Sequence, residues 1–271
     1  MLLAVFAFSL MQGLIKFVSH IHVFQIVFFR SFITAIICAT MLQREGVSMV
    51  GKNQGILFLR AFLGLTSMTL FFITIQRIPY GAAVTLRYLA PFFTFLLAIW
   101  LLKEKVKSAQ WFFLLTALCG VALLKGFDAR IDGLSLLLAI LGAFFAGCVY
   151  VILRKIGKSE HPLVIVNYFM CTAAVVSGCA MLLTWETPAL NELLILICVG
   201  GFGYFGQKYM TLSFQYEEAN IVAPFKYTEL VYAFAIGFFF FGEGYSSLSF
   251  LGVALLLISC IGNVLVRSRV A

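Results

Sequence analysis

The ionisable side chains inside apolar segments are the residues of this sequence with the clearest capacity for chemistry. Lys226 and Glu229 stand three residues apart in the stretch PFKYTEL, so on a helix they share a face and could pair. Arg30 and Arg87 lie in two other apolar segments, and a guanidinium can bind a carboxylate through two hydrogen bonds. Because Glu229 is the one carboxylate far from a segment end, these side chains predict a polar interior with excess positive charge.

The composition indicates where such an interior would lie. The chain has 271 residues, of which 63% are hydrophobic and 11% charged, whereas a soluble domain carries about 25% charged residues. At about 20 apolar residues for each membrane-spanning helix, the chain has room for roughly ten spans. We therefore predict an all-α integral membrane protein with ten transmembrane helices. The expected spans are residues 2–19, 23–42, 55–75, 79–102, 108–125, 133–154, 162–184, 190–214, 219–242 and 247–266.

Lysines and arginines are distributed unevenly among the predicted loops. If the amino terminus is cytoplasmic, ten of them lie in the inner loops and tail and three in the outer loops. An excess of cations on the inside is typical of membrane proteins, so we expect both termini in the cytoplasm, in a bacterial inner membrane. The net charge of +8 mostly reflects this topology. We expect the lipid bilayer and a small-molecule substrate as partners, no nucleic acid, and a monomer or homodimer.

An internal repeat links the two halves of the chain. The fourth and ninth predicted spans match at an offset of 139 positions, which aligns Arg87 and Tyr88 with Lys226 and Tyr227. Two units of five spans must have opposite orientations because five is odd, and inverted repeats of this kind underlie alternating-access carriers. Arg87 and Lys226 would then lie on either side of the bilayer midplane. The predicted units are residues 1–126 and 132–267.

Two prolines interrupt the matching spans. Pro224 lies in the ninth predicted span and Pro91 in the fourth, where each removes a backbone hydrogen bond. They predict either hinges that let one helix bundle rock or static bends, and they are not equivalent in the repeat. Three other cations, Lys16, Arg60 and Lys208, are nearer to span ends, and we expect them to extend to the membrane surface.

Further polar and small residues accompany the cations. The Lys226–Glu229 pair could line a cavity, or it could be a structural ion pair that keeps its helix in register. The four glycines of the stretch GGFGYFGQKY predict close helix packing more than a binding site. Side chains able to donate or accept hydrogen bonds in a cavity are Gln12, Gln207, Tyr88 and Tyr227.

Metal and catalytic chemistry have little support in the sequence. The seven cysteines fall singly in apolar segments, without the spacing of metal ligands or disulfides. No histidine lies within a predicted span, and neither a membrane aspartate pair nor an HExxH motif occurs. We therefore expect no metal, no cofactor and no enzymatic activity. A non-transporting scaffold or regulatory protein and an intramembrane enzyme are the alternatives.

Four stretches together resemble one family. They are FQIVFFRSF (24–32), LRAFLGLTSMTLFF (59–72), IPYGAAVTLRYLAPFFTFLLAIWLLKE (78–104) and EEANIVAPFKYTELVYAFAIGFFFFGE (217–243). Over nearly its whole length the chain is similar to ten-span carriers of the drug/metabolite transporter superfamily, in the EamA-domain branch. The resemblance implies a secondary transporter of a small organic metabolite, with a central cavity lined largely by spans 1, 3, 4, 6, 8 and 9.

The resemblance leaves the substrate open. The stretch APFKYTELV is also similar to that of bacterial S-adenosylmethionine carriers. We expect an amino-acid-like, carboxylate-bearing or nucleoside-like metabolite, moved by alternating access with proton coupling or by exchange. As the carboxylate at depth, Glu229 is the candidate for proton coupling. The candidates for substrate binding are Lys226, Tyr227, Glu229, Arg87, Tyr88, Arg30, Gln207 and Gln12, with Pro224 and Pro91 as candidate hinges.

Overall fold

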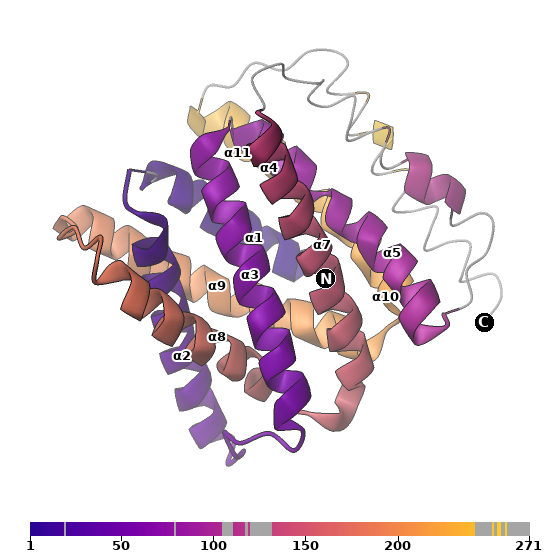
Figure 1. Cartoon of the computed structure of the whole chain (residues 1–271), viewed down its shortest axis with the longest axis horizontal. Coiled ribbons are helices and arrows are strands. Elements are labelled where there is room, and N and C mark those ends of the chain that lie inside the picture. Colours follow the sequence, from indigo (N-terminus) through magenta and orange to yellow (C-terminus); the bar gives the residue numbers. More distant parts are fainter. Residues whose placement is uncertain are drawn as a thin grey trace.

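The computed structural model shows a bundle of packed helices (Figure 1). It describes residues 1–18, 20–78, 80–104, 111–116, 119, 132–241, 251, 254, 255 and 258. All regular elements within these ranges are helical, in agreement with the predicted fold class. The fifth and tenth predicted spans lie mostly outside the described residues, so the structure does not test them.

The helices follow the predicted apolar segments closely. Five of them, α2, α3, α7, α8 and α9, are long and apolar enough to cross a bilayer, while α1 and α5 are apolar but shorter. The protein is therefore a multi-pass membrane protein. The elements are α1 (Leu2–Phe17), α2 (Val23–Arg44), α3 (Gln54–Arg77), α4 (Tyr80–Arg87), α5 (Leu89–Leu102), α7 (Gly133–Ile156), η1 (Gly157–Ser159), α8 (Pro162–Met181), α9 (Leu190–Tyr216), α10 (Ala219–Val222), η2 (Ala223–Thr228) and α11 (Glu229–Phe241).

Polar residues in the short connections set where several helices begin. The Asn53 side chain accepts a hydrogen bond from the backbone N–H of Ile56 at 3.3 Å at the start of α3. Asp132 does the same for Ser135 at 3.2 Å at the start of α7. Such caps satisfy N–H groups that have no partner within the helix. Helices α3 and α7 thus begin where an apolar segment meets a short polar side chain.

Helix ends in the first half recur in the second half at the offset predicted from the sequence. The starts of α2 and α8, the ends of α3 and α9, and the starts of α4 and α10 are each separated by 139 residues. His22 precedes α2 and His161 precedes α8, again 139 residues apart. Several helix ends thus recur at the spacing of 139 residues.

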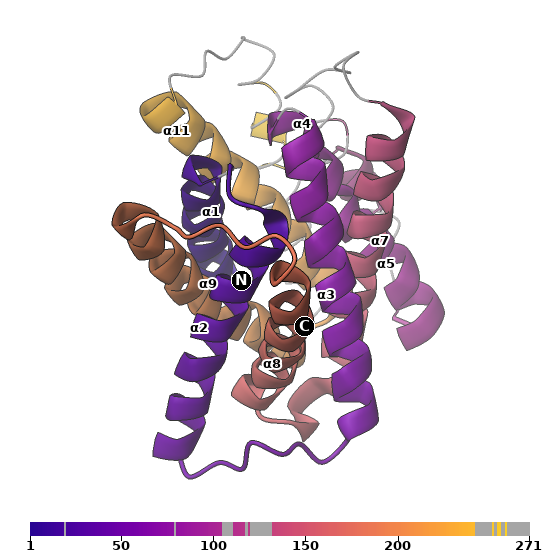
Figure 2. The same ribbon diagram turned by 60° about the vertical axis from the view of Figure 1, so that its left-hand side comes forward.

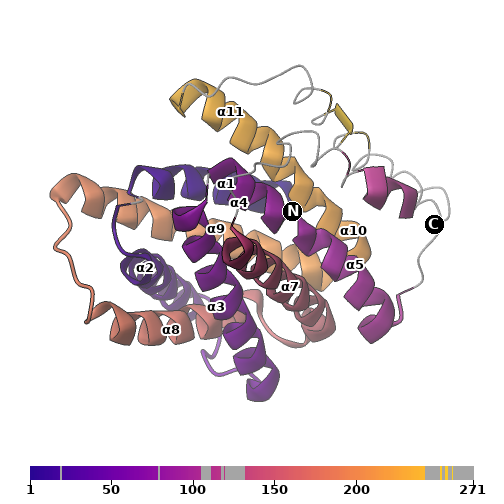
Figure 3. The same ribbon diagram turned by 45° about the horizontal axis from the view of Figure 1, so that its top comes forward.

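The closest helix packing joins the two halves. Helix α2 packs on α8, α3 on α7, α1 on α9, and α5 on α7. Figures 2 and 3 show the same arrangement from two sides, with α7 lying between α3 and α5. A single large cluster of buried apolar side chains extends across both halves. Neither half buries its apolar surface alone, so side chains from both halves meet in the centre.

Two helical segments are broken at positions that the repeat makes equivalent. Helix α4 ends at Arg87 and α5 begins at Leu89, which leaves Tyr88 between them. In the second half, α10 is followed by the six-residue 3-10 helix η2, which contains Tyr227, and then by α11. A 3-10 run longer than three or four residues is uncommon within a helix and often marks a hinge. The breaks occur at Tyr88 and around its repeat counterpart, Tyr227.

The prolines account for both breaks. Pro91 has no N–H to donate to the carbonyl of Arg87, and its ring crowds that carbonyl, so the helix is interrupted just before it. Pro224 stands near the start of η2, where the missing N–H favours the change from α-helical to 3-10 geometry. Each proline lies three residues from the tyrosine of its break, on opposite sides. The structure thus contains both interruptions that the prolines predicted.

Glycines let the helices approach closely, as the glycine-rich stretch of α9 predicts. A Cβ atom at Gly200 would lie 2.5 Å from Ile33, and one at Gly206 would lie 2.6 Å from Phe8. By contrast, Gly201 faces open space. The glycine-rich face therefore packs against α1 and α2 and does not form a ligand site.

Helix α7 approaches the broken segment just as closely. A Cβ atom at Gly147 would lie 2.9 Å from the Cβ of Phe93 and 3.1 Å from the backbone N of Thr94. We expect Gly147→Ala to lower the free energy of unfolding by about 1–3 kcal/mol because the backbones must move apart. Thermal unfolding in detergent measures the loss. Gly201→Ala is the matched control within a helix, and equal stability of the two variants would contradict the predicted close approach.

Candidate functional site

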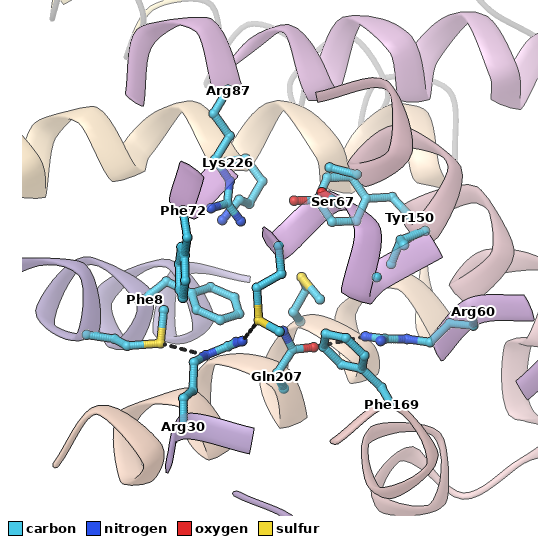
Figure 4. Close-up of a pocket in the computed structure, with 16 residues that line it drawn as sticks. Phe8, Arg30, Arg60, Ser67, Phe72, Arg87, Tyr150, Phe169, Gln207 and Lys226 are labelled. Atoms are coloured by element: carbon cyan, nitrogen blue, oxygen red, sulfur yellow. Dashed lines mark hydrogen bonds between the residues drawn. The ribbon is translucent and has the colours of Figure 1, made fainter. Parts of the chain in front are cut away.

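A small central cavity lies where the two halves meet. Its volume is about 50 Å³, and sixteen residues from α1, α2, α3, α4, α7, α8, α9 and η2 line it (Figure 4). The family resemblance implied spans 1, 3, 4, 6, 8 and 9, which correspond here to α1, α3, α4 with α5, α7, α9 and the segment from α10 to α11. Each of these spans contributes to the lining, and α2 and α8 contribute as well. A cavity of this size holds a few water molecules. Binding of a metabolite therefore requires the lining side chains to move.

Four cationic side chains line this cavity: Arg30, Arg60, Arg87 and Lys226. The Arg60 side chain is fully buried, and Arg30 and Lys226 are each 3% exposed. Arg30 experiences the like charge of Arg87, and Arg60 that of Arg30. Burial of charge in a membrane interior costs at least about 2.5 kcal/mol for each group. Such a cluster is characteristic of a functional site because packing alone would favour apolar residues.

Aromatic rings cover two of the arginines. The Arg60 guanidinium carbon lies 4.1 Å from the centre of the Phe169 ring, and that of Arg87 lies 3.9 Å from the Phe71 ring. A desolvated cation over an aromatic face gains about 2 kcal/mol. These contacts offset part of the cost of burial and leave the positive charges in place.

Arg30 contacts sulfur atoms instead. Its Nε donates to the Met11 sulfur at 3.1 Å, and its Nη1 contacts the sulfur of Met68. Thioether sulfur is only a weak hydrogen-bond acceptor. The partners of Arg30 are therefore readily displaced by a stronger acceptor such as a carboxylate.

Lys226 belongs to a buried hydrogen-bonded group. Its Nζ lies 2.6 Å from Oε2 of Glu229, and the Gln12 side chain donates to Oε1 of the same carboxylate. Glu229 is 2% exposed, and the Lys226 Nζ also lies 4.7 Å from the centre of the Phe8 ring. Lys226 lines the cavity, whereas Glu229 and Gln12 lie behind it. Lys226 thus lies between the cavity and the buried carboxylate of Glu229.

The two tyrosines of the helix breaks touch each other. The ring centres of Tyr88 and Tyr227 are 6.1 Å apart, and both side chains are buried. Their chain neighbours Arg87 and Lys226 line the cavity, while the tyrosines themselves do not. The structure therefore brings the two broken segments together beside the cavity.

Arg60 is the main cavity residue that sequence reasoning missed. Its distance from the predicted span end suggested contact with the membrane surface, and the structure shows it fully buried in the cavity wall instead. Gly64 makes this possible, because a Cβ atom there would lie 2.9 Å from Nη1 of Arg60. A glycine four residues after an arginine lies on the same helix face, and this spacing was the available signal.

The remaining predicted polar residue, Gln207, lies in the cavity wall. Its Oε1 accepts a hydrogen bond from Nη2 of Arg60 at 2.9 Å. Of the side chains predicted to bind substrate, Arg30, Arg87, Gln207 and Lys226 line the cavity directly. Within the described ranges, no three histidine, cysteine or acidic side chains gather in a way that could hold a metal ion.

Comparison with known proteins places this geometry in a family. The model of the EamA-like transporter family matches residues 1–125 and 133–265. The chain belongs to the EamA-like transporter family. A crystal structure with the same fold superposes with a TM-score of 0.82 at 16% identity, over 97% of this chain and 96% of that one.

The curated relatives of this EamA-like protein include carriers named for different substrates. A pseudopaline exporter of Pseudomonas aeruginosa is 29% identical over 96% of this chain and 92% of its own length. Human solute carrier family 35 member G1 is 30% identical over 89% of this chain and 71% of its own. An S-adenosylmethionine uptake transporter of Rickettsia prowazekii is 26% identical over 83% of this chain and 77% of its own. The chain is therefore a membrane transporter and not an enzyme.

The buried ion pair leads to a stability prediction. We expect Glu229→Ala to lower the free energy of unfolding by about 3–5 kcal/mol, because Lys226 then stays buried without its counter-charge. Replacing both partners, as Lys226→Met with Glu229→Leu, should restore most of that loss. Thermal unfolding of the purified variants in one detergent measures both effects. A double variant less stable than Glu229→Ala would contradict the ion-pair interpretation.

Proposed function

We propose that this EamA-like protein is a secondary carrier that moves a small carboxylate-bearing metabolite by alternating access. The observation that carries the proposal is the cationic cavity between two broken helices, with Arg87 and Lys226 at equivalent positions of the two halves. In carriers, discontinuous helices at the interface of two repeats commonly form the substrate site.

The proposed topology has ten spans arranged as two inverted five-helix repeats, at residues 1–126 and 132–267. Several helix ends recur at a spacing of 139 residues, which supports this topology. The match of the family to two segments of the chain also supports it. The excess of cations in the predicted inner loops favours two cytoplasmic termini in a bacterial inner membrane. We propose a monomer or homodimer in the bilayer, with a small molecule and no nucleic acid as ligand.

Charge balance favours an anionic group on the substrate. Four cations line the cavity and a single carboxylate, that of Glu229, pairs with one of them. Among the described residues, Arg30 contacts methionine sulfur and Arg87 lies over an aromatic ring. A substrate carboxylate would supply the strong acceptor that these side chains lack, and arginine suits it because its donors form a planar fork.

The relatives agree with this substrate class without selecting one member of it. One is named for export of pseudopaline and another for uptake of S-adenosylmethionine, so relatives of similar sequence work in opposite directions. Amino-acid-like molecules, including S-adenosylmethionine, carry the carboxylate that the cavity favours. Alternating access would arise because the broken segments can bend where their backbone hydrogen bonds are missing.

Coupling to protons would depend on Glu229. A substrate carboxylate that contacts Lys226 competes with Glu229 for the same ammonium group, whose Nζ now lies 2.6 Å from that carboxylate. Once displaced, a buried carboxylate is stabilised by taking up a proton. Binding of substrate and protonation of Glu229 would then favour each other, which is the linkage that a proton–substrate symporter needs.

The central test is transport by the purified protein. In liposomes we expect saturable countertransport of a carboxylate-bearing substrate, found by a ligand-screened thermal-shift assay with amino acids, nucleosides and dicarboxylates. Lys226→Ala should weaken binding about 10- to 100-fold, because a hydrogen bond to a charged group contributes about 1.5–3 kcal/mol. Lys208→Ala is the matched control, since Lys208 lies outside the cavity. Wild-type affinity in Lys226→Ala would assign this lysine to structure alone.

A separate prediction concerns coupling. We expect Glu229→Gln to abolish accumulation driven by a pH gradient, because an amide cannot carry the transported proton. Exchange of substrate for substrate should remain measurable, since it needs no net proton movement. The measurement is uptake into proteoliposomes at several internal and external pH values. An unchanged pH dependence would refute the role of Glu229 in coupling.

A further inference from the structure

We propose that Arg60 and Gln207 form a second anion subsite in the central cavity, so that the substrate carries two separated carboxylates. The proposal rests on the proposed function, because it assigns a further part of the same transport site. It narrows the substrate class from metabolites with one carboxylate to metabolites with at least two.

Arg60 has hydrogen-bonding capacity that the protein does not use. Its Nη2 donates to Gln207, whereas Nε and Nη1 are buried without a hydrogen-bond partner in the part of the chain that the structure describes. A guanidinium carries five N–H donors, and buried polar atoms in proteins are usually satisfied by protein, water or ligand. Because Arg60 lines the cavity, a bound molecule can reach these donors.

Arg60 also lacks a counter-charge. The Phe169 ring covers the guanidinium at 4.1 Å, and Gln207, its hydrogen-bond partner, is neutral. No ion pair recorded among the described residues includes Arg60. Arg30 adds a like charge to its surroundings. The cavity wall thus holds this cation in position but does not neutralise it.

Arg60 lies on an element different from those that carry Arg87 and Lys226, the cations at the helix breaks. We call the site at Arg87 and Lys226 the first subsite. Arg60 and Gln207 come from α3 and α9, whereas Arg87 and Lys226 come from α4 and η2 at the helix breaks. In Figure 4 the Arg60 side chain enters the cavity from another side than Arg87 and Lys226. Arg60 thus faces the cavity from an element other than those that carry Arg87 and Lys226.

Charge balance then favours a ligand with two acidic groups. With Glu229 paired to Lys226, the four cations exceed the carboxylates by three positive charges. A monocarboxylate would leave two of these charges, while a dicarboxylate would leave one. Buried like charges repel strongly at low dielectric. The second carboxylate therefore adds most to the binding affinity where it contacts Arg60, whose charge is otherwise uncompensated.

The test compares acids with amides of nearly the same shape. The probes are aspartate, glutamate and 2-aminoadipate, each paired with its side-chain amide, and binding to the purified full chain is measured by isothermal titration calorimetry. We expect the wild-type protein to bind at least one acid ten-fold or more tightly than its amide. Equal binding of acid and amide, or tighter binding of the amide, would overturn the second subsite while leaving the proposed function intact.

Two variants remove the subsite in different ways. Arg60→Gln deletes the cation, and Gln207→Glu supplies a fixed carboxylate next to it, so both should reduce the acid-to-amide affinity ratio toward one. Gln207→Glu should also raise the temperature of unfolding, because it pairs a buried cation, and it therefore tests the proposal even if Arg60→Gln does not fold. Lys208→Gln, beside Gln207 but outside the cavity, is the control and should keep the wild-type ratio.

The outcomes separate the two proposals. A wild-type ratio in Gln207→Glu would overturn the second subsite, whatever the stability of the variant. If neither acids nor amides bind, the second subsite is overturned, while the proposed function is judged separately by countertransport in liposomes. A ratio that falls in both variants, and stays high in Lys208→Gln, supports a second carboxylate on Arg60.

Discussion

The cost of holding positive charge inside a membrane protein is the constraint on which the rest of this structure depends. Three of the four cavity cations are almost completely buried. Each is kept by a contact that reduces the cost without removing the charge: Arg60 by Phe169, Arg30 by methionine sulfurs, and Lys226 by Glu229. Such an arrangement is stable enough to fold and still has charge available for a ligand.

These contacts explain why the two halves pack so extensively on each other. Arg60 on α3 lies against a ring from α8, and Lys226 on η2 lies against Phe8 from α1. Glu229, the ion-pair partner of Lys226, accepts a hydrogen bond from Gln12 of α1. Neither half contains all the partners of its own cations. Assembly of the cavity therefore requires association of the halves, and a relative movement of the halves would change the contacts of Arg60 and Lys226.

The helix breaks give such a movement a structural basis. Backbone hydrogen bonds that are missing near Pro91 and Pro224 must be satisfied by neighbouring groups, which a membrane interior tolerates only where protein or a cavity is adjacent. Both breaks lie beside the cavity, and Tyr88 and Tyr227 touch there. The prolines are not equivalent in the repeat, and Glu229 has no counterpart in the first half. We infer that the two broken segments bend differently and that coupling is asymmetric.

The sequence by itself determined the helical class, the course of most helices and the positions of the breaks. These follow from local causes, namely long apolar runs, short polar caps and prolines, which act within a few residues. It also indicated Arg30, Arg87, Lys226 and Gln207, because a polar group in an apolar run must face something other than lipid. Only the tertiary structure decided that Arg60 joins them, and that Gln12 and Glu229 meet across 217 residues. The distance of an arginine from the end of its helix does not reveal which face of that helix the neighbouring helices cover. The arginine extends into the cavity if it lies on the covered face and to the membrane surface if it does not.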